Sequence, residues 1–334
     1  MEIKQLEYFL AVSEQGSFSR AAVMLSVAQP ILSRYVRSLE EELGTELFYR
    51  NGRGVIVTES GEALTVHARN ILNSVHQISS DVAAVRDSPG GRLVIGLPPT
   101  ANVILGAPLV KRFREAYPRV KLKIQEGFSG HVYEWLSTGR IDVAILYNAP
   151  KTSTLITQPL IEEELCLIGA ADAPAELRER PVTGAELGKL PMILPSHPHG
   201  LRRLVDCFLA EINVEPNVEY EIDSLTSCLE LVEQGCGYTI LPYASVRRQV
   251  QAGQVVVMAL VEPRMTRQLV LATSTQRPMT TITRALASEV SDLVKELVHN
   301  GSWQQEKSLQ AKAAREAAAS EAYGKLRIAA SRDG

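Results

Sequence analysis

The segment GSFSRAAVMLSVAQPILSRYVRSLEEELGTELFYRNGR, at positions 16–53, predicts two short helices joined by a tight turn. Ser17 is a favourable N-cap for the first helix, and residues 26–28 interrupt it. Gln29 and Pro30 open a second helix, because proline is tolerated in a first helical turn, where its missing N–H costs little. The segment therefore has the layout of a helix-turn-helix.

The second helix has two chemically different faces when its residues are placed at about 100° intervals. Its inward arc holds Leu32, Val36, Leu39 and Leu43. Its outward arc holds Gln29, Pro30, Ser33, Arg34 and Arg37. No acidic residue occurs between Gln15 and Leu39. Gln and Arg can each form two hydrogen bonds with a base edge, so this face predicts a reader of the DNA major groove. The alternative is an ordinary helical hairpin with a solvated outer face.

Residues 47–58, LFYRNGRGVIVT, predict a β-hairpin with a glycine-rich tip. Arg50 and Arg53 lie at or near that tip, where they could contact phosphate or enter a minor groove. A winged helix-turn-helix over residues 1–57 is the resulting expectation. A surface hairpin with two solvated arginines is the alternative.

The charge of the whole chain does not by itself favour DNA. The 334 residues carry a formal net charge of −3, so DNA affinity has to come from a local basic face. The four cysteines lack CxxC spacing, which favours free thiols in a reducing compartment, the cytoplasm. We expect no cofactor, no metal site, no signal peptide and no membrane span, since no apolar run approaches about 18 residues.

Residues 58–90 predict one long helix that leads into a hinge-like linker, Ser88-Pro89-Gly90-Gly91. Apolar side chains repeat in it with alternating spacings of four and three, at Leu64, Ala68, Ile71, Val75, Ile78, Val82 and Val85. Such a heptad seam favours a partner helix, and so a homodimer through 58–86. A two-fold dimer would bind a roughly palindromic DNA site. Packing of the helix onto its own domain is the alternative.

Residues 91–301 alternate between apolar strand-like runs and helical stretches, which is typical of α/β structure. Two lobes joined by crossing strands, near 160–165 and 263–269, would leave a cleft suited to a small molecule. The fold class is therefore α+β multidomain. Residues 302–334 are rich in Ala, Lys and Glu and predict a frayed helix or a disordered tail without an assigned function.

Several longer motifs carry a family resemblance. They include LEYFLAVSEQGSFSRAA at 6–22, QPILSR-x-V-R-x-LE-x-ELG at 29–44, PLVKRFREAYPRVKL at 108–122 and GRIDVAIL at 139–146. Over about residues 1–300 the chain resembles a LysR-type transcriptional regulator. The resemblance implies a winged helix-turn-helix, a dimerising linker helix and a two-lobed, periplasmic-binding-protein-like effector domain, in tetramers that bend promoter DNA.

A departure and a narrower resemblance accompany these motifs. Ala28 stands where relatives often carry serine, which removes a probable helix cap or phosphate contact. GLPPT at 96–100, EGFSGHVYEWL at 126–136 and ILYNAP at 145–150 are similar to the nitrogen assimilation control subgroup. That similarity suggests nitrogen-linked target genes and identifies no ligand.

Effector-binding residues are expected at strand ends and helix starts, where unpaired backbone N–H groups suit anions. The candidates are Thr100, Ser129, Gly130, Tyr147 and Asn148 on one lobe, and Ser196, His197 and His199 on the other. The resemblance places effector contacts on the same segments. Their side chains predict a polar pocket that is not strongly cationic, and so a small polar metabolite and not a phosphate ester.

Two further interpretations of these residues are weak. His197 and His199 lack a third nearby metal ligand, and Ser129 with His131 lacks a strained nucleophile turn and a positioned acid. No catalytic residue is therefore assigned, and the chain is predicted to be no enzyme. The main prediction is a regulator that binds double-stranded promoter DNA and a small effector. The alternatives are a ligand-independent constitutive regulator, or an enzyme or solute-binding protein with a helical oligomerisation domain.

Overall fold

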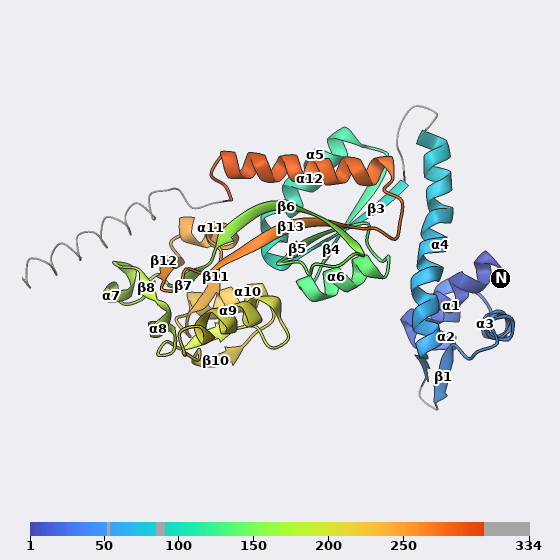
Figure 1. The fold of residues 1–334 in the computed structure, drawn as a ribbon, viewed down its shortest axis with the longest axis horizontal. Helices are drawn as coiled ribbons and strands as arrows, with labels where there is room; N and C mark the ends of the chain where they lie inside the picture. The colour runs from blue at the N-terminus through green and yellow to red at the C-terminus, as the bar shows by residue number, and fades with distance from the viewer. Residues whose placement is uncertain (52–53, 85–90, 304–334) are drawn as a thin grey trace, which may run out of the picture.

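The computed structural model describes residues 1–51, 54–84 and 91–303. The N-terminal domain contains α1 (Ile3–Gln15), α2 (Phe18–Leu25), α3 (Gln29–Leu43), and the strands β1 (Phe48–Asn51) and β2 (Gly54–Val57). A long helix, α4 (Glu59–Ala84), extends away from this domain towards the second half of the chain (Figure 1). The predicted order of helices and wing is confirmed.

Local chemistry sets the helix-turn-helix boundaries. Ser17 caps α2 by accepting a hydrogen bond from the backbone N–H of Arg20 at 3.4 Å. Ser26 ends that helix with a left-handed backbone, φ 54°. Ala28 occupies the N-cap of α3 without a side-chain cap bond, and Pro30 lies in the first turn. The start of α3 is therefore favoured by the fixed backbone angle of Pro30 and not by a capping hydroxyl.

The inward arc of α3 is buried as predicted, except at its end. Leu32, Val36 and Leu39 are fully buried with side chains of α1 and α2 in one core. Leu43 is 42% exposed, so its predicted core position was wrong. Its helical phase still points inward, but it lies in the last turn before the Gly44 cap, where the helix has passed the end of the core.

The wing is attached to the turn between α1 and α2. Strands β1 and β2 pair antiparallel, and Val55 donates its backbone N–H to the carbonyl of Gly16 at 3.0 Å. A Cβ at Gly54 (φ 150°) would lie 2.6 Å from that same carbonyl oxygen, so only glycine permits this approach. Arg50 lies in β1, and Arg53 falls outside the described residues.

The first half of α4 belongs to the N-terminal core. Ala68 is buried there, and Leu64 and Ile71 pack against it. Arg69 is buried too and donates to Glu14 of α1 at 2.9 Å, while burial lowers its pKa. These first seam positions are thus covered by the same chain and do not require a partner helix. Val75 is 36% exposed, the side chains at 78 and 82 are not described, and Val85 lies outside the described residues.

The first effector lobe is built on a five-stranded sheet of order β4-β3-β5-β13-β6. Its strands are β3 (Gly91–Leu97), β4 (Val120–Glu126), β5 (Val143–Tyr147), β6 (Leu155–Glu164) and β13 (Thr266–Ser274). Strand β3 pairs parallel with β4 and β5, whereas β13 pairs antiparallel with β5 and β6. Helices α5 (Pro99–Ala116) and α12 (Thr281–His299) cover one face, and α6 (Ser129–Ser137) covers the other (Figure 1).

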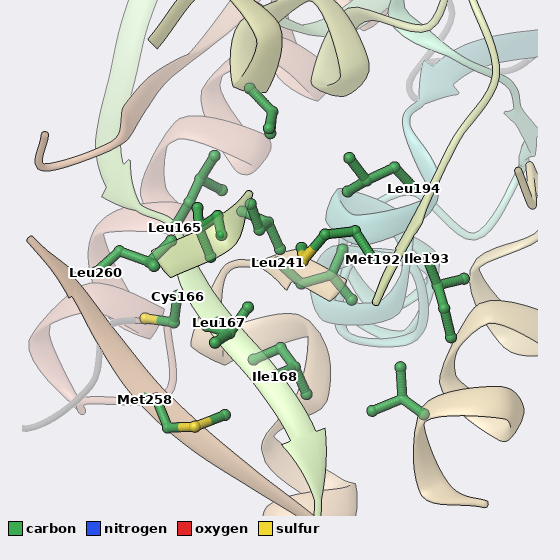
Figure 2. Close-up of a cluster of buried hydrophobic side chains, with 14 of the residues drawn as sticks. Leu165, Cys166, Leu167, Ile168, Met192, Ile193, Leu194, Leu241, Met258 and Leu260 are labelled. Carbon is green, nitrogen blue, oxygen red and sulfur yellow. The ribbon is translucent and has the colours of Figure 1, made fainter. Parts of the chain in front are cut away.

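The second lobe has a four-stranded sheet of order β11-β7-β12-β8 and a separate pair, β10-β9. Its strands are β7 (Cys166–Ala170), β8 (Val182–Thr183), β9 (Met192–Leu194), β10 (Val218–Glu221), β11 (Thr239–Leu241) and β12 (Val255–Val261). Its helices are α7 (Ala175–Arg178), α8 (Gly184–Leu187), α9 (Gly200–Ala210), α10 (Leu225–Glu233) and α11 (Tyr243–Gln251). Figure 2 shows apolar side chains of β7, β9, β11 and β12 meeting in its core.

The chain crosses between the lobes twice, as predicted. Strand β6 leads directly into β7, and β12 leads back into β13. The two crossings are side by side, since Leu165 donates its backbone N–H to the carbonyl of Met265 at 2.9 Å. Two antiparallel connecting strands therefore form the hinge between the lobes.

None of the described helices is both long and apolar enough to span a bilayer. All four cysteines are free thiols: Cys166 and Cys228 are buried, and Cys207 and Cys236 are exposed. Over the described ranges no group of three His, Cys, Asp or Glu side chains is arranged to hold a metal ion.

The burial of α3 gives a matched pair of substitutions. We expect Leu39→Ala to reduce the free energy of unfolding by about 2–5 kcal/mol, because it leaves a cavity in the N-terminal core. Leu43→Ala, at the exposed end of the same helix, should change it by less than about 1 kcal/mol. Urea titration followed by circular dichroism compares them, and equal losses would contradict the burial pattern.

Candidate DNA-binding face and effector cavity

The outer face of α3 presents polar and basic side chains to solvent. Gln29, Pro30, Arg34 and Arg37 are exposed and Ser33 is half-buried. Gln29 donates its side-chain amide to Ser33 Oγ at 3.0 Å, which fixes the first turn of the face. Arg37 forms an exposed i,i+4 pair with Glu41 at 3.4 Å, whereas Arg34 has no ion pair among the described residues. Arg34 is therefore the cation on this face that is most available to a ligand.

A cavity of about 150 Å³ lies between the two effector lobes. The predicted residues that line it are Thr100, Ser129, Gly130, Tyr147, Asn148 and His199. Ser196 and His197 do not line it. Lining residues that were not predicted from sequence are Phe128, Arg203, Asp223 and Arg267, together with an apolar wall that includes Leu201, Leu204 and Ile222.

Helix N-termini from both lobes converge on this cavity. Thr100 lies in the first turn of α5, Ser129 and Gly130 open α6, Gly200 opens α9 and Leu225 opens α10, and all of them line it. The first N–H groups of a helix have no partner within the helix, and the helix dipole is positive at that end. The backbone alone therefore makes the cavity favourable for a negatively charged group.

A buried polar cluster forms the floor on the side of the first lobe. Arg267 donates through Nη2 to Thr100 Oγ1 at 2.9 Å, and the Thr100 hydroxyl donates to Tyr147 Oη at 3.0 Å. The guanidinium carbon of Arg267 also lies 3.5 Å from the centroid of the Tyr147 ring, a cation–π geometry. Burial raises the pKa of Tyr147, so its hydroxyl stays protonated.

The charge of Arg267 is compensated from behind. Glu163 Oε1 accepts hydrogen bonds from Arg267 at 2.6 Å, and these side chains are 3% and 5% exposed. Ser129 is used differently, since its Oγ accepts the backbone N–H of Tyr147 at 3.2 Å. The floor thus combines a neutralised ion pair with hydroxyls whose orientations are fixed.

Phe128 and His199 meet across the cavity from opposite lobes. Their rings contact edge to face, with centroids 4.2 Å apart. His199 Nδ1 accepts the backbone N–H of Leu201 at 3.0 Å and so caps α9. Burial lowers the pKa of His199 to about 4, which keeps the ring neutral at physiological pH with Nε2 as its donor.

The chain matches two known protein families. The description "Bacterial regulatory helix-turn-helix protein, lysR family" matches residues 3–62. The description "LysR substrate binding domain" matches residues 86–295, which include both lobes and the cavity. The chain belongs to the LysR family of transcriptional regulators.

Individual relatives agree with this assignment. The regulator is 31% identical over 299 residues to the HTH-type transcriptional regulator BbuR of Bordetella bronchiseptica, covering 89% of this chain and 91% of that protein. It is 32% identical over 249 residues to the nitrogen assimilation regulatory protein nac of Klebsiella aerogenes, covering 74% and 80%. A full-length OxyR variant from Pseudomonas aeruginosa shares its fold, with a TM-score of 0.67 at 23% identity over 88% of this chain and 95% of that one.

The positions of Ser196 and His197 in this LysR-type regulator differ from the expected ones. Ser196 donates its backbone N–H and its hydroxyl to Asp223, each at 2.9 Å, which lowers the pKa of that carboxyl group. Ser196 thereby fixes a wall residue without reaching the cavity itself. His197 points to Asp206 at 3.2 Å and is largely exposed, so it does not converge with His199.

Asn148 lines the cavity, but its side-chain oxygen is already occupied. Its backbone is left-handed, φ 47°, and its Oδ1 accepts the backbone N–H of Gln268 at 2.9 Å. The backbone N–H of Asn148 in turn donates to the carbonyl of Gln268 at 2.9 Å. Asn148 therefore joins the end of β5 to β13, which carries Arg267.

The lowered pKa of His199 predicts a pH dependence. Below about pH 6.5 the unfolded chain binds a proton at His199, whereas the folded protein resists protonation until about pH 4. The unfolded state then binds more protons, so stability falls as the pH drops from about 6.5 towards 4. His199→Asn retains an oxygen that can cap α9 and does not titrate. We expect its melting temperature to fall less steeply over this range than that of the wild type, and parallel curves would contradict the assignment.

Proposed function

We propose that this regulator binds promoter DNA by inserting the N-terminal half of α3 into the major groove. Gln29, Ser33 and Arg34 would meet base edges, while Pro30 and Arg37 flank them and Arg50 and Arg53 of the wing contact the backbone. The burial of Leu32, Val36 and Leu39 supports this orientation, because it fixes the polar arc outward. Arg34 is expected to contribute most, since Arg37 is shared with Glu41.

Replacing Arg34 tests this face. We expect Arg34→Ala to weaken promoter binding by about 1–3 kcal/mol, the usual contribution of a well-placed base contact. A gel-shift titration at fixed salt measures it. Arg119→Ala removes the same charge from an exposed site of the effector half and is the matched control. Equal losses in the two variants would show that only bulk charge matters.

We propose a small monocarboxylate as the effector. The observation that carries this proposal is the convergence of helix N-termini from both lobes on one cavity. Phe128, Leu201 and Ile222 offer apolar contact to the rest of the molecule. A cavity of this volume, about 150 Å³, accommodates a single aromatic ring. Arg203 and Arg267 line the cavity together with Asp223, so its side chains carry one net positive charge, which supports a ligand with a single negative charge and not a phosphate ester.

We infer a direct physical route by which an effector signal would reach the DNA-binding half. Helix α6 begins at the cavity with Ser129 and ends beside α4. There Asn73 of α4 donates its side-chain N–H to the carbonyl of Gly139 at 2.8 Å, and Arg277 donates to the carbonyl of Ile141, two residues further along, at 2.7 Å. We infer that lobe closure moves α6 as one rigid element and shifts α4, which carries the recognition helix.

The proposal extends to the dimer contact and to the genes that the regulator controls. Members of this family form oligomers, and we place a dimer contact on the second half of α4, beyond the part buried in its own domain. Similarity to nac supports a link to nitrogen-related genes in the cytoplasm of a bacterium. The effector is expected to be bound and released without chemical change, because the Ser129 hydroxyl accepts a backbone N–H and, within the ranges that the structure describes, has no base hydrogen-bonded to it that could activate it. A cavity between the lobes that is lined by several helix N-termini also favours an effector-dependent regulator over a constitutive one.

Filling the cavity separates the two functions. A Cβ at Gly130 would have no neighbour within 4 Å, so a side chain there enters open space and not a packed core. We expect Gly130→Leu to abolish the rise in melting temperature that monocarboxylates give, while promoter affinity stays within about twofold of wild type. Gly130→Ala is the control, since it suits the helix and adds little volume. Retained ligand response in Gly130→Leu would place the effector elsewhere.

A further inference from the structure

Trp303 follows α12 and is buried in the core of the first effector lobe. Its side chain is 2% exposed and packs in the same core as Phe113. Its backbone N–H donates to the carbonyl of Leu297 at 2.9 Å, which turns the chain back over the end of α12. The position of this indole is therefore set by both packing and a backbone hydrogen bond.

The indole N–H reaches the ion pair behind the cavity. Trp303 Nε1 donates to Glu163 Oε2 at 2.9 Å, while Glu163 Oε1 accepts from Arg267 at 2.6 Å. Glu163 and Arg267 are directly opposite each other in the pairing of β6 with β13. With one oxygen held by tryptophan and the other by arginine, the carboxylate cannot rotate without losing a buried hydrogen bond.

Arg267 is in turn held where it lines the cavity. Nη2 donates to Thr100, the ring of Tyr147 lies against the guanidinium, and Glu163 binds Nε. Nη1 has no hydrogen-bond partner in the described part of the chain. A planar guanidinium fixed on three sides keeps this remaining donor in one direction, as directional recognition of a carboxylate requires.

We propose that Trp303 is a positioning residue for effector recognition. It acts through Glu163 on Arg267, and Arg267 distinguishes a carboxylate effector from the corresponding neutral amide. The inference rests on the proposed monocarboxylate effector. It adds that selectivity for the charged group depends on a residue that lies behind the cavity wall and does not touch the ligand.

The test uses the full-length protein with benzoate and benzamide as probes, measured by isothermal titration calorimetry. Trp303→Phe keeps an aromatic ring in the core but removes the N–H donor together with part of the ring volume, and the loss of packing is controlled for by Phe113→Leu. We expect it to weaken benzoate binding by about tenfold, as for the loss of a buried hydrogen bond to a charged group, and to leave benzamide within about twofold. Arg267→Gln should reduce benzoate binding at least as much.

A double-mutant cycle identifies the route. If Trp303 acts through Arg267, Trp303→Phe causes no further loss of benzoate affinity in the Arg267→Gln background. Phe113→Leu loosens the same core without touching the ion pair and serves as the control. Additive losses, equal losses for both probes, or an equal selective loss in Phe113→Leu would overturn the positioning role. Absence of benzoate and benzamide binding to the wild type would overturn the proposed effector class, and this inference with it.

A spectroscopic signature gives a second readout. The chain has two tryptophans, so Trp135→Phe leaves Trp303 as its single tryptophan, whose emission is observed with excitation that tyrosine does not absorb. We expect benzoate to shift the emission of that variant more than benzamide does, because only the carboxylate perturbs Arg267 and Glu163. The Arg267→Gln substitution should remove the difference between the probes. Identical responses to both probes in the Trp135→Phe protein would contradict the connection from cavity to indole.

Discussion

The buried ion pair between Glu163 and Arg267 is the interaction on which the effector half depends. It joins the two strands that connect the lobes, and its arginine lines the floor of the cavity. Removing one partner of such a pair usually costs about 3–5 kcal/mol, because the other is left charged without compensation. The same pair therefore fixes the hinge geometry and the chemistry of the site. Neither strand can slide relative to the other without separating these charges.

The arginines on the outer face of α3 follow the opposite electrostatic rule. Arg34 and Arg37 are exposed, which leaves them available to a partner. The chain as a whole is acidic, with a formal net charge of −3, so attraction to DNA has to be local. Arg37 is less available to a partner than Arg34, because Glu41 forms an ion pair with it. Burial thus separates the arginines that stabilise the interior of this protein from those that remain available to bind DNA.

Local periodicity explains what could be predicted from sequence. The inward face of α3 was predictable because helical phase follows from the order of consecutive residues. The prediction was wrong at Leu43 because helical phase does not indicate where along the helix the core ends. Thr100 and Ser129 were found because strand ends and helix starts gather at one edge of an α/β sheet. Ser196 and His197 lie on an irregular loop, where no periodicity gives a side-chain direction. The seam of α4 was ambiguous because its apolar stripe fits its own domain equally well.

The unpredicted residues had weaker signals. Arg267 shares its strand face with the buried Leu269 and Leu271, so alternation could have marked it as an internal charge. Trp303 was assigned to the segment 302–334, which was predicted from its overall composition to be a frayed helix or a disordered tail. A single large aromatic side chain can nevertheless hold the start of such a segment in the core. The partner of Trp303, Glu163, is distant in sequence, and no pattern within a single chain connects the two.

The location of Arg267 has one consequence for signalling. It lies on one of the two paired strands that connect the lobes, so a ligand group bound to it would move less on lobe closure than a group bound far from this crossing. A molecule can shift an equilibrium only through contacts that differ between the two states. Phe128 and His199 approach each other from opposite lobes, so contacts that bridge them have to change when the lobes move apart. Tight binding and activation are then separable, and a compound that satisfies the hinge but is too short to bridge the rims would be an antagonist.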